Sequence, residues 1–282
     1  MALIAAKNAV VDSGLAIESC DKGRVSVVVG ADKSQLSPAL FFAEEVSKES
    51  ARLVNPEFYK HLSVTGPCYN IRDMIGSQGA SFGCGNGLGA IGAGMMSIWD
   101  DEADVVLAGN TEQSVHPYLI SNEKEKAQAD GSTVIVLEEL NHALSRNARI
   151  YAELKAFTQT HSKGNTEKAL SQSLKKSGLS PGSLSVLVHS TEPTHSTLNL
   201  PGSFLVANPS TYFGSTTGGL GSMYLAISVL IMEHRSIPRT LLFPASEPSV
   251  SGYKQIDPEN ILCVVHGSND LISSVLLTKY RP

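Results

Sequence analysis

Two apolar segments that are rich in glycine, one in each half of the chain, constrain the fold more than any other feature. The first reads GNGLGAIGAGMMSIW at 85–99, and the second reads GGLGSMYLAISVLIMEH at 218–234. Both have the length and apolar character of a buried helix. Each glycine costs such a helix about 1 kcal/mol relative to alanine, so glycines are tolerated there where another backbone must come very close. We therefore expect two buried helices that pack directly against neighbouring backbone.

Short apolar runs surround both segments and predict the strands of an α/β fold. The expected strands are 24–30, 103–109, 132–140, 148–160, 183–190, 261–268 and 271–279, with a shorter extended piece at 76–83. Further helices are expected over the first fifteen residues, with Gly14 as their stop, and at 37–53 and 165–178. The repeated order of a glycine-rich helix among apolar strands indicates an internal duplication. We expect two halves, namely 1–160, which carries Cys84, and 161–282, which carries His189 and Ser215.

Charge and cysteine content exclude several classes of function. The 282 residues include 22 Lys and Arg against 27 Asp and Glu, a net charge of −5, and the basic residues form no run. Such a chain is a poor binder of nucleic acid or of anionic membrane surfaces. The four cysteines are widely spaced, without a CxxC pair or a Cys/His cluster, so we expect no metal and no cofactor. No apolar stretch reaches the ~18 residues of a membrane span, and Lys7, Asn8 and Asp12 interrupt the N-terminal run, so we expect a cytoplasmic protein without a signal peptide.

Cys84 is the strongest candidate for a nucleophile. It lies between the extended piece at 76–83 and the glycine-rich helix at 85–99. A thiol at the N-terminus of a helix faces the positive end of the helix dipole, which favours the nucleophilic thiolate. A strand, a tight turn and a helix in this order also expose a side chain at a sharp bend. The alternative is a buried cysteine that acts as a small hydrophobe, as free cysteines often do.

Four segments carry a resemblance to a known family. They are GASFGCGNGLGAIGAGMMSIWDDEADVVLAGNTE (79–112), TVIVLEELNHALSRNARIYAELKAF (133–157), MALIAAKNAVVDSGL (1–15) and GSTTGGLGSMYLAISVLIMEHRSIPRT (214–240). They resemble the β-ketoacyl-ACP synthases, the condensing enzymes of the thiolase superfamily, in which a Cys is followed by a buried helix and a strand of the form ADV-VAGG-E. The segment 133–157 is the most specific match. The resemblance implies a thiolase-like layered α/β fold with two related halves, of which the N-terminal half is trimmed.

The resemblance also assigns catalytic positions. A condensing member of this family uses a Cys, which accepts the acyl chain, and two histidines, which support decarboxylation of malonyl-ACP and hold the enolate oxygen. Cys84 matches the nucleophile, and His189 matches the first histidine, with a core histidine as the alternative role. The position of the second histidine, directly after Gly214, is Ser215. Serine has no imidazole, so it cannot take over that electrostatic role.

Other features of the family are reduced in this sequence. The family's lysine falls near Ser210, and its glycine-rich gating loop is reduced to the four residues from His266 to Asn269. The region between Glu112 and Ser132 lacks the family's capping insertion, and the sequence begins later than that of a full-length synthase. The remaining candidates for contact with an acyl chain or a partner are Phe82, Gly83, Asn86, Gly214, Gly218 and Asn269.

Three further patterns predict no chemistry of their own. The run from Gly218 to Gly221 matches neither GxGxxG after a strand nor a P-loop with its lysine, so it does not predict nucleotide binding. Ser215 lies in no Gly-x-Ser-x-Gly motif. Polar, loop or helix-end contexts predict solvated side chains for a further set, namely His61, His116, His142, His161, His195, His234, Glu138 and Glu139.

We expect a ketosynthase-like subunit of a type II polyketide or fatty-acid system. The missing second histidine argues against full decarboxylative condensation. It favours a non-condensing partner of the chain-length-factor type, which forms a heterodimer or heterotetramer with a competent ketosynthase and meets an acyl carrier protein. The retained Cys84 supports a second hypothesis, an acyltransferase or thioester-processing enzyme with Cys84 as acyl nucleophile and His189 as base. A structural scaffold without an acyl tunnel is the third.

Overall fold

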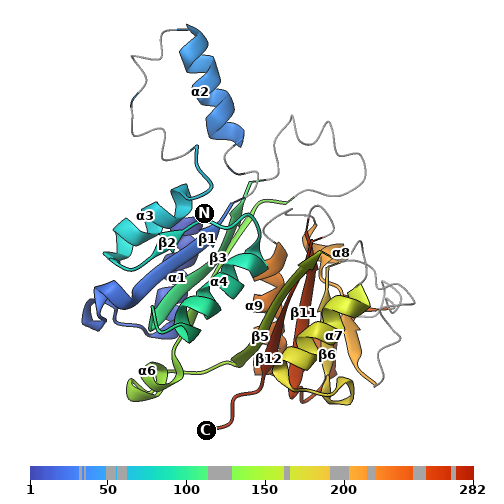
Figure 1. Cartoon of the computed structure of the whole chain (residues 1–282). Helices are drawn as coiled ribbons and strands as arrows, with labels where there is room; N and C mark the ends of the chain where they lie inside the picture. The colour runs from blue at the N-terminus through green and yellow to red at the C-terminus, as the bar shows by residue number, and fades with distance from the viewer. Residues whose placement is uncertain are drawn as a thin grey trace. The chain divides into compact units, whose positions relative to one another are not determined.

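A computed structural model gives the architecture of the chain (Figure 1). It describes residues 1–31, 34, 36–48, 55, 62–113, 129–161, 166–190, 203–214, 220–243, 252–267 and 271–282. The chain forms two compact units. Unit 1 comprises Met1–Ala148 and Ser215–Ser222, and unit 2 comprises Arg149–Gly214 and Met223–Pro282. The strand that ends at His161 belongs to unit 2, rather than to the N-terminal half as expected, because it pairs with the last strand of the chain.

Unit 1 is built on a four-stranded sheet in the order β2-β1-β3-β4. The strands are β1 (Val25–Gly30), β2 (Ser81–Phe82), β3 (Val105–Glu112) and β4 (Gly131–Glu138). β1 runs parallel to β2 and β3, whereas β4 runs antiparallel to β3. Every residue of β1 and β3 is buried, as expected of parallel strands that are covered on both faces.

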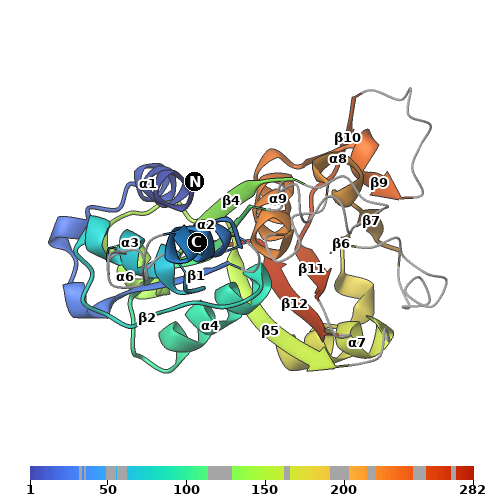
Figure 2. The ribbon, with the colours of Figure 1, turned by 90° about the horizontal axis from the view of Figure 1, so that it is seen from above.

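Helices cover both faces of this sheet, as Figures 1 and 2 show. α1 (Ala2–Ser13) packs on β4, and α3 (Gly66–Ile75) packs on β1. α4 (Gly87–Trp99) packs on β1 and β3 from the opposite face. α1 and α3 each end at a glycine with positive φ, 61° at Gly14 and 66° at Gly76, a backbone conformation that glycine adopts without steric cost. Gly14 is thus the helix stop that the sequence predicts.

Unit 2 is built on a six-stranded sheet in the order β5-β12-β11-β6-β7-β9. The strands are β5 (Glu153–His161), β6 (Val186–His189), β7 (Leu205–Ala207), β9 (Leu242–Phe243), β11 (Asn260–His266) and β12 (Leu271–Thr278). β11, β6 and β7 are parallel to one another at the centre, and the outer pairs are antiparallel. α7 (Thr166–Ser177) packs on β5 and β12. α9 (Leu220–His234) lies on the other face (Figure 2), where Ser228 hydrogen-bonds Cys263.

Shorter elements complete the structure that is described. They are the helices α2 (Leu36–Lys48), α6 (Leu140–Ser145) and α8 (Ser210–Phe213), the paired strands β8 (Ser236–Pro238) and β10 (Tyr253–Gln255), and the 3₁₀ turns Ile17–Ser19, Lys22–Arg24, Pro181–Ser183 and Arg239–Leu241. The α/β class expected from the sequence is confirmed. α3 is a helix that the sequence pattern did not predict, because it opens with Gly66-Pro67 and its apolar residues are few.

Glycine at the start of α4 permits a direct contact between two backbones, as the sequence predicts. A Cβ at Gly87 would lie 2.5 Å from the backbone nitrogen of Ser222, and a Cβ at Gly221 would lie 2.4 Å from that of Leu88. All four residues belong to unit 1. Real Cβ atoms do not come so close to other atoms, so a side chain at either glycine would force the two chain segments apart.

Replacement of Gly87 by alanine tests this contact. We expect Gly87→Ala to lower the free energy of unfolding by about 1–3 kcal/mol, because the added methyl group meets backbone that cannot rotate away. Urea denaturation followed by circular dichroism measures the change. The control is Gly85→Ala, where an added Cβ has no heavy atom within 4 Å and should leave the unfolding midpoint unchanged. Equal effects of the two substitutions would contradict the close approach at Gly87.

Candidate functional site

The candidate site of unit 1 lies where its parallel strands end. In open α/β sheets, ligands bind outside the carboxyl ends of the strands. β1 ends at Gly30, which is in register with Asn110 on β3. Cys84 follows β2 by two residues and precedes α4 by three, so the strand, turn and helix expected around it are present. The short parallel strand and the buried helix therefore bring Cys84 to this edge.

The backbone of Cys84 is held against the end of β1 by a glycine. A Cβ at Gly30 would lie 1.7 Å from the carbonyl oxygen of Cys84. Only a residue without a side chain leaves room for the Cys84 carbonyl at this place. Gly30 therefore fixes the position of the Cys84 backbone relative to the end of β1. The only sign of this role in the sequence was a glycine at the end of a strand.

The thiol of Cys84 lies beside the first turn of α4. A Cβ at Gly89 would lie 2.8 Å from Cys84 Sγ. Glycine at position 89 therefore leaves room for the Cys84 thiol. Asn86 caps the helix, since its side-chain oxygen accepts a hydrogen bond from the Gly89 N–H. The N-terminal end of a helix favours negative charge. Cys84 is partly exposed, so an electrophilic carbon can approach its sulfur.

Asn110 is a polar residue at this edge that the sequence analysis did not single out. Its side chain is buried, and neither polar atom of its amide has a hydrogen-bond partner in the part of the chain that the structure describes. The amide nitrogen lies 3.0 Å from the place of a Gly30 Cβ, on the same side as the Cys84 carbonyl. The family pattern ADV-VAGG-E has glycine at this position. The signal that could have found it is the polar end of β3, where Asn110, Thr111 and Glu112 follow an apolar run and are all buried.

The other cysteines have different surroundings. Cys68 is buried, its thiol hydrogen-bonds the backbone of Val29 and Phe82, and burial raises its pKa to about 11. Cys263 is buried in the sheet of unit 2, where burial raises the pKa of its thiol to about 12. Burial is also the main cause that raises the pKa of Cys20, which is partly exposed. Both buried thiols remain protonated at neutral pH, so Cys84 stays the candidate nucleophile.

The candidate residues of unit 2 lie at the carboxyl ends of its central strands. His189 is the last residue of β6 and is 1% exposed. His266 is the last residue of the neighbouring parallel strand β11. The two ring centroids are 5.0 Å apart, with an angle of 64° between the ring planes. The fold thus brings together His189 and a histidine that the sequence analysis had assigned to a reduced gating loop.

The remaining candidates divide into described and undescribed residues. Phe82 is partly exposed at the end of β2, and Gly83 follows it, where a Cβ would lie 2.7 Å from the carbonyl oxygen of Val64. Gly214 ends α8 with a positive φ of 67°. Three candidates, Ser215, Gly218 and Asn269, lie outside the described residues.

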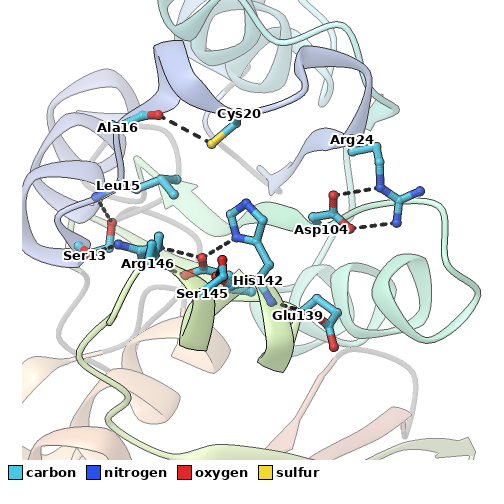
Figure 3. A network of polar contacts seen from close by, with 11 residues as sticks. Ser13, Leu15, Ala16, Cys20, Arg24, Asp104, Glu139, His142, Ser145 and Arg146 are labelled. Carbon is cyan, nitrogen blue, oxygen red and sulfur yellow. Dashed lines mark hydrogen bonds and ion pairs between the residues drawn. The ribbon is translucent and has the colours of Figure 1, made fainter.

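A polar network in unit 1 corrects two expectations from the sequence. Glu138 and His142 are not solvated separately, since the Glu138 side chain is only 9% exposed and binds both His142 Nδ1 (2.5 Å) and Arg146 (2.6 and 2.7 Å). Arg146 also donates to the carbonyl oxygen of Ser13, which ties α1 to the end of β4 (Figure 3). Burial alone would raise the pKa of Glu138, but the hydrogen bonds from Arg146 and His142 outweigh it and hold that pKa below its usual range. The segment 133–157 therefore includes a structural ion-pair network.

Comparison with known proteins defines the class of the fold. The sequence profile of the family "Beta-ketoacyl synthase, N-terminal domain" matches residues 1–127. The ketoacyl synthase alpha subunit of the tetracenomycin polyketide synthase from Streptomyces glaucescens is 24% identical, over 88% of this chain and 71% of its own length.

Two solved structures share the fold. A type II polyketide synthase acyl-carrier protein in complex with its ketosynthase, bound to the hexaketide, matches with a TM-score of 0.85 at 17% identity, over 99% of this chain and 84% of the matched chain. The ishigamide ketosynthase/chain length factor matches with a TM-score of 0.82 at 16% identity, over 99% and 81%. The fold is therefore thiolase-like. In sequence the chain is similar to ketosynthases, and the matched family profile covers residues 1–127 of its 282 residues.

The described residues contain neither a membrane-spanning helix nor a metal-binding cluster. No helix among them is long and apolar enough to cross a membrane. Within the same part of the chain, no three His, Cys, Asp or Glu side chains are grouped so that they could hold a metal ion.

Native-state alkylation tests the assignment of the thiols. We expect iodoacetamide to modify Cys84 and Cys20 in the folded protein and to spare Cys68 and Cys263, because reaction requires an accessible thiolate. Peptide mass spectrometry after timed quenching measures the four rates. In urea all four cysteines should react, which is the control for intrinsic reactivity. Rapid labelling of Cys68 in the folded protein, with Cys84 unlabelled, would reverse the assignment.

The ion-pair network predicts a pH-dependent contribution to stability. At pH 7 we expect Glu138→Gln to lower the free energy of unfolding by about 2 kcal/mol, because Arg146 loses a buried charged partner. The pKa of Glu138 is lower in the folded chain than in the unfolded one. Its contribution is therefore present above the unfolded pKa and is lost as the pH falls below roughly 4.

Chemical denaturation of both proteins across this pH range measures the difference. Asp101→Asn is the control. Asp101 pairs with Arg24, but its side chain is 90% exposed, so this ion pair should contribute little to the free energy of unfolding. A difference between Glu138→Gln and wild type that does not change with pH would contradict the role of charge.

Proposed function

We propose that this protein is a non-condensing subunit of the chain-length-factor type. It pairs with a catalytically competent ketosynthase in a type II polyketide or fatty-acid system and receives chains that are bound to an acyl carrier protein. The observation that carries the proposal is a serine at position 215, which the resemblance aligns with the second catalytic histidine of condensing relatives. Without an imidazole there, the usual support for decarboxylation of a malonyl thioester is missing at that position.

The edge of the unit 1 sheet supports a stable partner. β2 is an edge strand of the described sheet, has two residues and carries the partly exposed side chain of Phe82. Edge strands in stable proteins are covered or paired, because their free backbone groups otherwise recruit other chains. A partner subunit that covers this edge fits the proposal. The likeness of the fold to a ketosynthase/chain length factor structure is consistent with such an assembly.

Acyl transfer is the second candidate function, and the geometry of Cys84 favours it. The thiolate would attack the carbonyl carbon of an acyl thioester, forming a new carbon–sulfur bond at Cys84. The carbon–sulfur bond to the carrier would break, and the carrier thiolate would leave and take up a proton. Backbone N–H groups at the N-terminus of α4 are donors of the kind that stabilise the oxyanion of the intermediate. This chemistry needs no decarboxylation.

Intact-protein mass spectrometry separates the two functions. The chain is expressed alone and together with a catalytically competent ketosynthase from the same organism, and each sample is incubated with an acyl-ACP. We expect the two proteins to co-purify and the acyl mass to be found on the ketosynthase. Cys84→Ala should then leave product formation within about twofold of wild type, because the nucleophile belongs to the partner.

Two outcomes would contradict this proposal. One is an acyl adduct on this chain that Cys84→Ala abolishes together with product, which would establish acyl transfer through Cys84. The other is a chain that stays monomeric in the presence of the ketosynthase. Cys20→Ala is the matched control, since Cys20 is also a partly exposed thiol and lies away from the edge that carries Cys84.

A further inference from the structure

The carboxyl edge of the unit 2 sheet carries a polar side chain at the end of each central strand. β11, β6 and β7 run parallel, and His266, His189 and Asn208 stand at or directly after their ends. All other positions of β6 and β11, apart from Asn260 at the start, are apolar. Apolar strands that each end in a polar group at the same edge are typical of a binding site in an α/β sheet.

The two histidines at this edge form a close pair. Their ring centroids are 5.0 Å apart, and the ring planes are inclined by 64°. His189 is 1% exposed, whereas His266 is partly exposed. A molecule that approaches this edge from solvent therefore reaches His266 before His189.

The backbone holds both histidines in place. The Ser190 N–H donates to the carbonyl oxygen of Val264 (3.2 Å), and the His266 N–H donates to Ser190 Oγ (2.9 Å). Ser190 follows His189 directly, so the two bonds tie together the ends of β6 and β11. A side-chain pair on such a fixed backbone loses little freedom when a ligand binds, which favours recognition.

The charge state of His266 suits a neutral polar ligand. Burial lowers the pKa of His266, so at neutral pH its imidazole is uncharged and has one N–H donor. A carbonyl oxygen has two lone pairs, so it can accept one hydrogen bond from each of two imidazoles. A metal ion is the other common ligand of paired histidines, but among the described residues no third His, Cys, Asp or Glu is placed to complete a metal site.

We propose that His266 supplies a second imidazole to unit 2 and that, with His189, it binds the carbonyl oxygen of an acyl thioester. The inference rests on the proposed function, since it takes the ligand to be a thioester delivered on a carrier. It goes beyond that function in assigning a binding residue to β11.

Binding of a stable thioester analogue tests the assignment. The probe is hexanoyl-pantetheine in which a methylene group replaces the thioester sulfur, so that the carbonyl remains and hydrolysis is blocked. It is titrated into the full chain, labelled with ¹⁵N in its histidines, and the imidazole resonances are followed by NMR. We expect the signals of His189 and His266, assigned from His189→Phe and His266→Phe, to shift together with one dissociation constant.

Substitutions at position 266 separate hydrogen bonding from packing. His266→Phe keeps a ring of similar size without an N–H donor and should weaken binding about tenfold, the effect of one lost hydrogen bond. His266→Gln restores a donor and should recover most of the affinity. The control is His234→Phe, at the exposed end of α9 in the same unit, which should not alter binding. If His266→Phe does not fold, His266→Gln provides the assignment of the His266 resonance, and the shifts of the wild-type resonances decide the question.

The outcomes separate this inference from the proposed function. Binding in which the His266 resonance does not move and His266→Phe has no effect overturns the inference. So does a chain that co-purifies with its ketosynthase but does not bind the probe. In both cases the partner role stands. Conversely, a chain that binds the probe through both histidines but never associates with a ketosynthase supports the inference and overturns the partner role.

Discussion

The contact between Gly30 and Cys84 is the constraint on which the candidate site of unit 1 depends. The carbonyl oxygen of Cys84 occupies the place that any side chain at position 30 would fill. Because β1 is buried at every position, Gly30 cannot move aside to make room. The turn after β2 is therefore fixed in position relative to the end of β1, and the Cys84 thiol lies beside the first turn of α4. Geometry at this edge is set by the absence of a side chain rather than by a favourable side-chain contact.

The same physical rule places the polar groups of both units. Parallel strands that are covered by helices are apolar along their length, so a polar side chain is accommodated where the strand leaves the sheet. In unit 1 this edge holds Cys84 and the buried amide of Asn110. In unit 2 it holds His189 and His266. The two units thus share an architecture and differ in the chemistry that they present, a thiol in one and imidazoles in the other.

The sequence alone predicted the parts of the fold that are set by local apolar patterns. The buried helix at 85–99 and the strands at 24–30 and 103–109 followed from continuous apolar runs, and the glycines of that helix predicted close backbone contact. α3 was missed because Gly66-Pro67 at its start and its polar residues hide the helical period. Its stability comes from packing on β1, which no local pattern reveals.

Parts of the site that depend on pairing between distant segments could not be predicted in this way. Glu138 seemed a solvated charge at the end of a strand, because its partner Arg146 and the carbonyl of Ser13 meet it only in the fold. The pair of His189 and His266 joins residues that are far apart in sequence, and the parallel register of β6 and β11 alone brings them together. The setting of Cys84 between a short strand and a buried helix was predictable, because it depends on neighbours within a few residues.

These differences bear on how a reduced site is interpreted. The resemblance aligns Ser215 with a histidine of condensing relatives, which describes one sequence position and not a whole binding edge. Several strands end at one edge of the unit 2 sheet, and each of them can contribute a side chain there. His266 lies at such an end, next to the histidine that remains. By the number of matched family residues alone, this site is incomplete. The topology of the sheet nevertheless places two imidazoles with their ring centroids 5.0 Å apart. What unit 2 can bind is therefore decided by the side chains that share this edge, whichever segments they come from.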